Sequence, residues 1–287
     1  MIVIRNGNSV AEVNERGELA SYKFNGKEYM WNAGKEFWDW HSPVLFPFVG
    51  RVKNAQTRFE GKLYSGQTIH GFARDLPFTA TETGENYCVL KTQYTDETLK
   101  LFPYPFALYA RFDVAEDSVS VGYTVENVGS TPMQYVIGGH PALLIPAPLG
   151  DMDIITKGLE NARYFTADEN GLVVFDEPYG YVKGSVLPFS LRLVERGGAI
   201  FTELGDCREF AVVDRNTGKG FSLEFPDFPV CTLWMPNRED SPFICVEPWC
   251  GLPDDHVTDG NFESKPFRQT LAPGEKKTYN YKIKPIV

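Results

Sequence analysis

The sequence predicts an all-β protein of mostly antiparallel strands with very little helix. The 287 residues include 26 Gly and 20 Pro, which favours many turns between short strands over a helical bundle. Residues 107–126 alternate apolar and polar side chains in two arms, as antiparallel strands with one buried face do. Asn25-Gly26 separates two β-prone runs, which is a strong signal for a hairpin because both turn positions need a positive φ.

The remaining elements follow in chain order. Strands that form hairpin arms are expected over residues 18–24, 27–31, 87–95, 107–114, 119–125, 209–214, 220–225 and 277–287. Only Asp96–Phe102 has helix signals, a capping residue at its start and Pro103 behind it, and these suffice for about two turns. No internal repeat or linker-like stretch divides the chain. We therefore expect a single β-sandwich domain over residues 1–287.

Composition excludes several classes of protein. Apolar residues make up 43% of the chain, too many for a mostly disordered protein. The net charge of −10 argues against nucleic-acid binding and against binding to anionic membrane surfaces. No signal peptide or membrane-spanning run is present, and the five Cys form no CxxC pair, which favours reduced thiols. We expect a soluble, cytoplasmic protein.

Two segments place a titratable side chain at the end of a predicted strand. His140 follows Gly138-Gly139 and precedes Pro141, so a rigid strand end would hold its ring in place. Glu247 ends the apolar run 243–246, where burial would raise the pKa of its carboxyl and make it a candidate general acid or base. The alternatives are purely structural roles: His140 could cap the strand end by hydrogen bonding, and Glu247 could pair with a cation on an edge strand.

Further polar and aromatic side chains are candidates for contacts with a sugar. His70 and Arg74 lie four residues apart in a predicted loop, and Arg51 closes a stretch that contains Phe, Pro and Gly. A guanidinium offers a fork of donors that suits neighbouring hydroxyls or a carboxylate. Trp rings can stack on a sugar, although each is more often core or rim packing. The candidate stacking residues are Trp38, Trp40, Trp234 and Trp249.

Other chemistries find little support in the sequence. It contains no phosphate-binding GxxxxGK[ST] loop, no GxSxG nucleophile elbow and no HExxH motif, and the four His have no metal-ligand spacing. Two acidic pairs, Asp254-Asp255 and Asp151 with Asp153, could form a glycosidase carboxylate pair or bind calcium. They lie in loop-like sequence, so solvated charges are the favoured interpretation.

Four segments together resemble the aldose 1-epimerase (galactose mutarotase) family, and in particular its LacX-like branch. The segments are FPFVGRVKN (46–54), IHGFARDLPF (69–78), GGHPAL (138–143) and FICVEPWCGLPD (243–254). Their order and spacing match the family over essentially the whole chain. The resemblance implies a β-supersandwich and an enzyme that interconverts the α and β anomers of a free hexose by acid–base ring opening, with no cofactor and no metal.

The resemblance also implies residue roles. His140 matches the general acid, Glu247 the general base, and Arg51 and His70 the residues that hydrogen-bond the sugar. We expect Glu247 to be ionised and His140 protonated in the active form, each stabilised by the other's charge. Arg74, Trp234 and Trp249 are expected to complete the binding site.

One family residue is missing, and this keeps alternatives open. Gly197, in the segment LVERGGAIF (193–201), stands where the family usually has an Asp, and neither Asp206 nor Asp214 has a spacing that identifies it as a substitute. The first alternative is a hexose-6-phosphate 1-epimerase, with Arg51, Lys53 and Arg74 as phosphate ligands. The second is a non-catalytic carbohydrate-binding protein. Monomer and homodimer are both compatible with the sequence.

Overall fold

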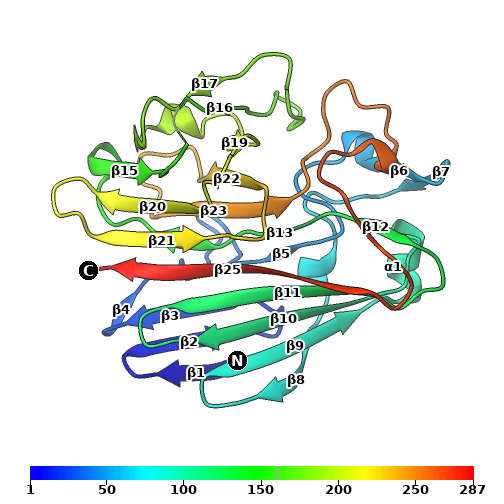
Figure 1. Ribbon diagram of the computed structural model, residues 1–287, viewed down its shortest axis with the longest axis horizontal. Coiled ribbons are helices and arrows are strands. Elements are labelled where there is room, and N and C mark those ends of the chain that lie inside the picture. Colours follow the sequence, from blue (N-terminus) through cyan, green and yellow to red (C-terminus); the bar gives the residue numbers. More distant parts are fainter. Residues whose placement is uncertain (160) are drawn as a thin grey trace.

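A nine-stranded antiparallel sheet forms the largest layer of the fold. The computed structural model describes residues 1–159 and 161–287. Figure 1 shows strands β20, β21, β25, β11, β10, β9 and β8 lying side by side in that order. The full order is β18 (Val186–Pro188), β15 (Met152–Ile155), β20 (Glu209–Asp214), β21 (Gly220–Glu224), β25 (Lys276–Ile286), β11 (Val119–Asn127), β10 (Phe106–Val114), β9 (Tyr87–Gln93) and β8 (Thr79–Thr83).

The centre of this sheet confirms the alternation found in the sequence. β10 and β11 pair in register from Phe106 opposite Asn127 to Val114 opposite Val119. Along β10 the side chains of Leu108, Ala110 and Phe112 are buried, whereas the intervening ones are partly or fully exposed. One face of the strand pair therefore packs into the core, as the period of two predicted.

A second, six-stranded sheet lies against the first, and its strands contain Trp234, Glu247 and Trp249 of the candidate site, with His140 directly after β13 (Ile137–Gly139). Its strands run in the order β19 (Ala199–Phe201), β22 (Val230–Trp234), β23 (Phe243–Cys250), β13 and β5 (Val44–Leu45), with β14 (Ala142–Leu144) also paired to β23. Every side chain of β23 is buried. A strand that is covered on both faces usually has a continuous run of apolar residues. β23 begins with such a run, residues 243–246.

The N-terminal strands form a third, four-stranded sheet. Its order is β1 (Ile2–Asn6), β2 (Ser9–Val13), β3 (Leu19–Phe24) and β4 (Lys27–Glu28). Asn25 and Gly26 connect β3 to β4 with φ angles of 51° and 77°, which confirms the predicted hairpin turn. β1 and β2 contact β9 and β10, so this sheet covers one end of the nine-stranded sheet.

Shorter elements complete the fold. Three two-stranded ribbons pair β6 (Gln56–Phe59) with β7 (Lys62–Ser65), β12 (Met133–Tyr135) with β24 (Gln269–Leu271), and β16 (Arg163–Tyr164) with β17 (Gly180–Tyr181). The α-helix α1 (Asp96–Leu101) confirms the single predicted helix, and Thr95 and Thr98 cap it reciprocally. No helix in the described ranges is long and apolar enough to cross a membrane.

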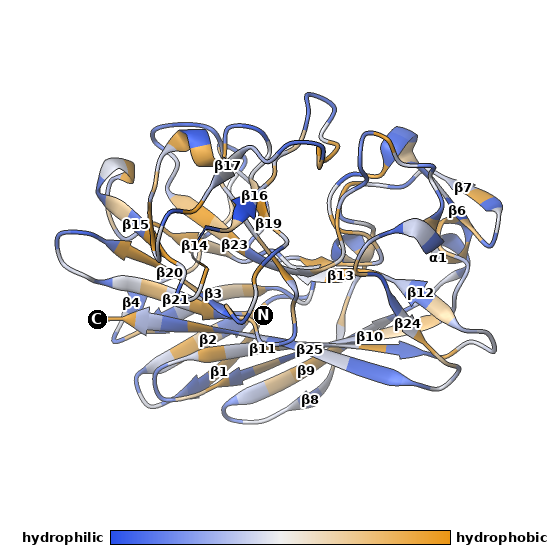
Figure 2. Ribbon diagram, turned by 45° about the horizontal axis from the view of Figure 1, so that its top comes forward, coloured by the Kyte–Doolittle hydropathy of each residue, from blue (hydrophilic) through white to orange (hydrophobic). Residues whose placement is uncertain are grey.

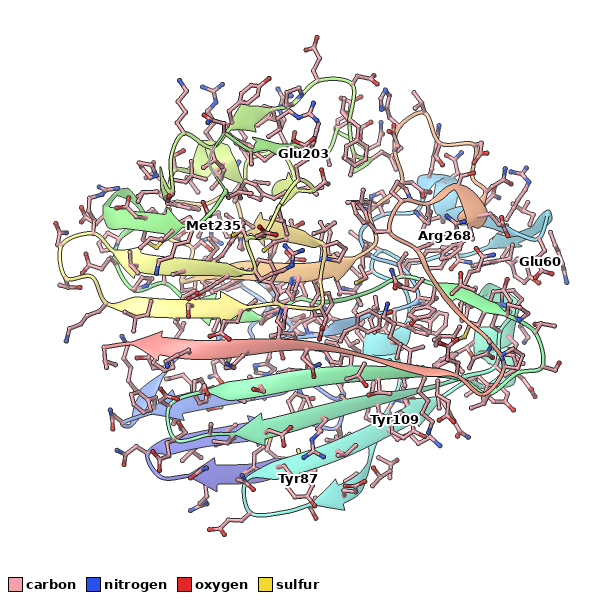
Figure 3. All side chains as sticks on the ribbon, viewed as in Figure 1. Glu60, Tyr87, Tyr109, Glu203, Met235 and Arg268 are labelled. Carbon is pink, nitrogen blue, oxygen red and sulfur yellow. The ribbon has the colours of Figure 1, made fainter. Side chains whose placement is uncertain are left out.

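The core fills the space between the sheets, and the outer faces are polar. Figure 2 shows apolar and polar stretches alternating along the strands. A chain of buried aromatic rings, including Phe46, Phe59, Phe102 and Phe106, packs at centroid distances of 4.8 to 5.6 Å. On the outer face of the large sheet, Tyr109 lies on β10 (Figure 3) and its hydroxyl donates to the Glu126 carboxylate over 3.0 Å.

One acidic residue predicted to be solvated is instead a buried anchor. Asp254 is 4% exposed and forms an ion pair with Lys265, which is 5% exposed. Its other carboxylate oxygen accepts a hydrogen bond from the Lys53 backbone N–H over 2.8 Å, and its own backbone N–H donates to the Arg51 carbonyl over 2.9 Å. The loop after β23 is thereby fastened to the segment that carries Arg51.

Removing one partner of this buried pair should destabilise the protein strongly, because the other charge would stay buried without a counter-charge. Lys265→Ala is expected to lower the free energy of unfolding by about 3–5 kcal/mol, measured by urea denaturation. Lys100→Ala is the matched control: it breaks the exposed Lys100–Glu97 pair and should cost less than about 1 kcal/mol. Equal losses in the two variants would contradict the assignment of Asp254 and Lys265 as an anchor.

Candidate active site

A cavity of about 410 Å³ opens over the six-stranded sheet and collects the predicted site residues except Lys53, whose ammonium donates to the His256 carbonyl over 2.6 Å. Its wall contains the seven predicted residues Arg51, His70, Arg74, His140, Trp234, Glu247 and Trp249, together with Trp38 and Trp40. These residues come from segments up to 211 positions apart in the chain, from Trp38 to Trp249, and the sheets bring them together. The size suits a small ligand such as a monosaccharide.

Close packing of β13 against its neighbours positions His140. A Cβ built on Gly138 would lie 2.5 Å from Cδ1 of Trp249, and one built on Gly139 would lie 2.8 Å from Cε1 of Tyr281. Both glycines are therefore required for close approach of aromatic rings, and neither has a positive φ. The chain leaves β13 at His140, whose backbone N–H donates to the Pro43 carbonyl over 3.2 Å.

The His140 ring and the Glu247 carboxylate meet at the base of the cavity. Nε2 of His140 lies 3.2 Å from Oε2 of Glu247, and the two residues are 4% and 1% exposed. Burial lowers the pKa of His140 well below its ordinary value of 6.5, and the neighbouring His70 and Arg74 lower it further. Burial also raises the pKa of Glu247 well above its ordinary 4.5, and the Trp249 side chain opposes this less strongly.

These two shifts describe the pair before a ligand enters, whereas the sequence predicted an ion pair for the active form. Desolvation disfavours both charges, so before a ligand enters the pair is stabilised with one proton between the two groups, on the carboxyl, and no charge on either. The sequence argument considered only the mutual attraction of the two groups. It could not weigh the desolvation that follows from enclosure between two sheets.

Aromatic rings fix the orientation of the His140 imidazole. The Trp38 ring stacks on it with centroids 4.6 Å apart and planes 28° apart. The Trp234 ring meets it edge-on at 5.6 Å, and the His70 ring does so at 5.2 Å. Trp38, a predicted sugar platform, thus holds the candidate acid in place.

His70 is a neutral hydrogen-bond donor. Its Nδ1 accepts a hydrogen bond from the Gly50 backbone N–H over 3.0 Å, and its own backbone N–H donates to the Gly50 carbonyl over 2.8 Å. Burial, with the charges of Arg74 and Arg51, lowers the pKa of His70 to about 3. Since Nδ1 is an acceptor, the ring proton resides on Nε2 and is available to a ligand oxygen.

Two guanidinium groups in the wall have no carboxylate partner. Arg74 lies in a short 3₁₀ turn, over the face of Trp40 at 4.9 Å, and its buried Nε has no hydrogen-bond partner. Arg51 is exposed at the cavity and packs against Gly171, where a Cβ would lie 2.7 Å from Nε. Among the described residues, neither is within ion-pair distance of a carboxylate. Arg74 is thus half-buried in the cavity wall and not a solvated surface residue.

The sequence profile of aldose 1-epimerases matches residues 1–284. The chain belongs to the aldose 1-epimerase family. It is 30% identical over 284 residues to the plasmid-borne protein LacX of Lactococcus lactis subsp. lactis, with 93% of each chain covered. The predicted resemblance to the LacX-like branch is thus confirmed.

Solved structures of the same kind share the fold. A galactose mutarotase-like protein from Lactobacillus casei has a TM-score of 0.89 and 30% sequence identity, with 99% of each chain covered. The galactose 1-epimerase of Lactobacillus acidophilus superposes with a TM-score of 0.71 over 99% of this chain and 94% of its own, at 14% identity. The predicted β-supersandwich is therefore confirmed.

The Asp that the aldose 1-epimerase family usually has is not replaced by a carboxylate in the described part of the cavity. Gly197 lines the wall with a φ of 73°, a conformation that favours glycine. Asp206 is exposed outside the cavity wall, and Asp214 accepts hydrogen bonds from the Asn216 backbone N–H and the Thr217 hydroxyl in a turn. Neither residue substitutes for the missing Asp.

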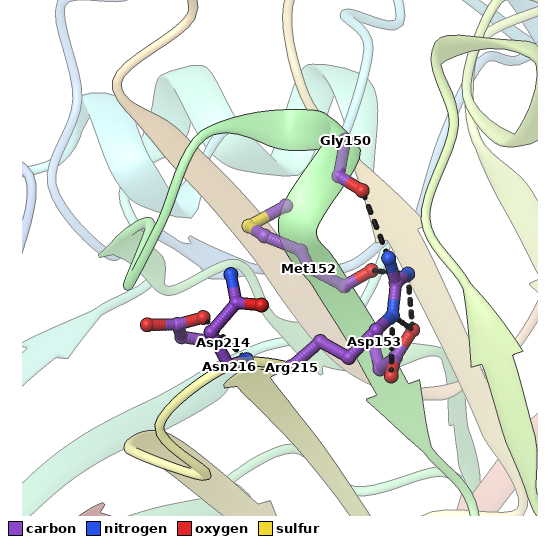
Figure 4. Close-up of polar contacts among 6 residues, drawn as sticks. All are labelled: Gly150, Met152, Asp153, Asp214, Arg215 and Asn216. Atoms are coloured by element: carbon purple, nitrogen blue, oxygen red, sulfur yellow. Dashed lines mark hydrogen bonds and ion pairs between the residues drawn. The ribbon is translucent and has the colours of Figure 1, made fainter.

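The other acidic pair is also accounted for by a surface interaction. Arg215 donates to both carboxylate oxygens of Asp153, at 2.6 and 3.1 Å, and to the carbonyls of Gly150 and Met152 (Figure 4). Asp214 and Asn216 flank this arginine. Asp153 is thus engaged outside the cavity, and the glycosidase interpretation of Asp151 with Asp153 finds no support in the geometry.

One polar wall residue was missed in the sequence. Thr232 lies directly opposite Glu247 in the β22–β23 pair, and its buried Oγ1 has no hydrogen-bond partner. A hydroxyl in the otherwise apolar run 230–234 was the available signal. Facing the carboxylate, it offers a donor or acceptor to a ligand.

The tautomer of His70 can be tested directly by NMR. At pH 5 its ring is expected to be neutral with the proton on Nε2, since a pKa of about 3 lies below this pH. Long-range ¹H–¹⁵N spectra of the ¹⁵N-labelled protein distinguish the tautomers, and His70→Asn assigns the signals. A ring that titrates with a midpoint near 6.5 would contradict the geometry.

Proposed function

We propose that the protein is an aldose 1-epimerase that interconverts the α and β anomers of a hexose. The single observation that carries this proposal is the buried contact between Nε2 of His140 and Oε2 of Glu247 at the base of the cavity. Opening a sugar ring requires one group to take a proton from the C1 hydroxyl and another to give a proton to the ring oxygen. A carboxyl and an imidazole that share one proton can do both.

The shared proton allows the pair to return to its starting state. When a sugar enters, its hydroxyls supply the hydrogen-bond partners that burial removed, which favours the charged form of the pair. The Glu247 carboxylate takes the proton of the C1 hydroxyl, and His140 Nε2–H protonates the ring oxygen as the C1–O bond breaks. The open aldehyde then faces a neutral pair, the form that burial stabilises.

Ring closure reverses these transfers. After rotation about the C1–C2 bond, the protonated Glu247 returns its proton to the carbonyl oxygen. The neutral imidazole of His140 takes the proton of the attacking hydroxyl as the C–O bond forms. Both groups regain their first protonation state, and the anomeric configuration has changed.

The surrounding residues would hold the sugar rather than move protons. The Nε2–H of His70 and the guanidinium of Arg51 are donors with no partner among the described residues, so they are free to bind sugar oxygens. The rings of Trp234 and Trp249 provide apolar surface for the C–H face of the sugar. Together they exclude water from the proton-transfer site.

Removing either member of the pair should abolish most of the rate. His140→Ala and Glu247→Gln are each expected to lower kcat for anomer exchange by about 10²–10⁴-fold, measured by polarimetry on freshly dissolved α-anomer. Asp206→Asn, which neutralises an exposed carboxylate outside the cavity, is the matched control and should leave the rate unchanged. Near wild-type turnover in Glu247→Gln would refute the proposed roles. Sugar binding without acceleration in the wild type would identify a non-catalytic binding protein instead.

A second candidate is an epimerase for anionic sugars such as hexose 6-phosphates. The observation that favours it is the pair of guanidinium groups, Arg51 and Arg74, that share the cavity without a carboxylate partner among the described residues. Arginine binds phosphate and carboxylate groups through its fork of donors. An anion beside Arg74 would also offset the charge that helps to lower the pKa of His140.

Two arginines on the same tryptophan separate this candidate from the first. Arg74 and Arg16 both lie 4.9 Å from the Trp40 ring centroid, but only Arg74 lines the cavity. With an anionic substrate, Arg74→Met should raise KM for a hexose 6-phosphate by about 10- to 100-fold, as expected for the loss of a charge-assisted hydrogen bond. Arg16→Met should not change it. Steady-state kinetics of the two variants with free hexoses and with hexose 6-phosphates measure these KM values. Equal KM values of the wild type and Arg74→Met for the 6-phosphate would eliminate this candidate.

A further inference from the structure

The proposed acid–base pair has a third neighbour with ligand chemistry of its own. Cys245 lies two residues before Glu247 on β23, so both side chains point to the same side of the strand. One ligand atom from each of His140, Cys245 and Glu247 lies within 4.8 Å of the other two, and all three residues are buried. Among the described residues, this is the one group of three or more His, Cys, Asp or Glu side chains that is close enough to share a cation.

This combination of atoms is a ligand set for zinc-like cations. Imidazole nitrogen, thiolate sulfur and carboxylate oxygen bind Zn²⁺ at about 2.0–2.3 Å, commonly as three protein ligands with one open position. The separation of 3.2 Å between His140 Nε2 and Glu247 Oε2 is that of two ligands on one tetrahedral centre. Only the Cys245 sulfur has to approach further. The cavity, which His140 and Glu247 line, provides an entry path and an open position.

Charge and unfilled hydrogen-bonding capacity support the same conclusion. A thiolate and a carboxylate balance a divalent cation, so the loaded site would carry no net charge and would be compatible with burial. Oε2 of Glu247 lies 3.2 Å from Nε2 of His140, but the contact does not have hydrogen-bond geometry, so this buried oxygen is without a hydrogen-bond partner. Such orphaned atoms are rare in folded proteins and call for a missing partner.

We propose that the protein binds one thiophilic divalent cation of the zinc class through Cys245, His140 and Glu247, and that the bound cation blocks the acid–base pair. Binding would displace two protons, the Cys245 thiol proton and the proton that His140 and Glu247 share. Apparent affinity therefore rises with pH. The blocking effect rests on the proposed epimerase function, whereas the binding of the cation does not.

Cadmium is a direct probe of the site, because a Cd²⁺–thiolate bond has an ultraviolet charge-transfer band. Titration of the reduced full-length protein with Cd²⁺ is expected to develop this band with a stoichiometry of one per chain. Cys245→Ala should abolish it. Cys88→Ala is the matched control and should keep it, since Cys88 is equally buried but lies on β9 in the nine-stranded sheet. A band that survives in Cys245→Ala, or no band in the wild type, would overturn the proposal.

The activity of the same variants tests the blocking effect. Zn²⁺ should inhibit anomer exchange by the wild type, and a chelator should restore it. Cys245→Ala, or Cys245→Ser if the alanine variant does not fold, should keep the basal rate. Either variant should require at least about 10-fold more Zn²⁺ for half inhibition, because loss of a direct ligand costs no less affinity than loss of an outer-shell partner. Equal sensitivity to Zn²⁺ in the wild type and the Cys245 variant would refute the blocking effect. A charge-transfer band in a wild-type protein without epimerase activity would refute the proposed function and leave the cation site standing.

Discussion

The buried contact between the His140 imidazole and the Glu247 carboxylate is the constraint on which the rest of the site depends. Two titratable groups 3.2 Å apart, each almost inaccessible to solvent, cost the fold desolvation free energy. Two packed sheets offset that cost, because β23 is covered on both faces and β13 is locked against the rings of Trp249 and Tyr281. The same burial sets the chemistry, since it keeps the pair in a form with one shared proton.

The remainder of the cavity is consistent with this constraint. The aromatic rings of Trp38 and Trp234 orient the imidazole without supplying a counter-charge. Burial keeps His70 neutral, and the hydrogen bond from Gly50 to its Nδ1 leaves the ring proton on Nε2, so His70 donates to a ligand without adding charge. The positive charge of Arg74, close enough to influence His140, makes the pair responsive to what the cavity binds. The same buried imidazole and carboxylate, with the Cys245 sulfur close by, also form a ligand set for a thiophilic cation.

The sequence alone predicted those features that depend on residues close together in the chain. The Asn25-Gly26 turn and the alternation in β10 and β11 depend on neighbouring residues, and the single helix depends on its own capping residues. The motifs also named the cavity residues correctly, although their roles stay predictions. The protonation of the pair, the burial of Asp254 and the nearness of Cys245 to His140 all depend on contacts between distant segments. No periodicity or spacing within one segment carries that information.

The pH dependence of kcat/KM for anomer exchange tests the central claim most directly, because it reports the ionisations of the free enzyme. A second proton on the pair would remove the acceptor that ring opening needs, so activity should fall on the acid side. Burial disfavours the positive charge that this proton adds, and the acid limb is therefore predicted well below pH 6.5, the ordinary value for a histidine. An acid limb centred at 6.5 or above would show a solvated imidazole and would contradict the account of a desolvated pair that shares one proton.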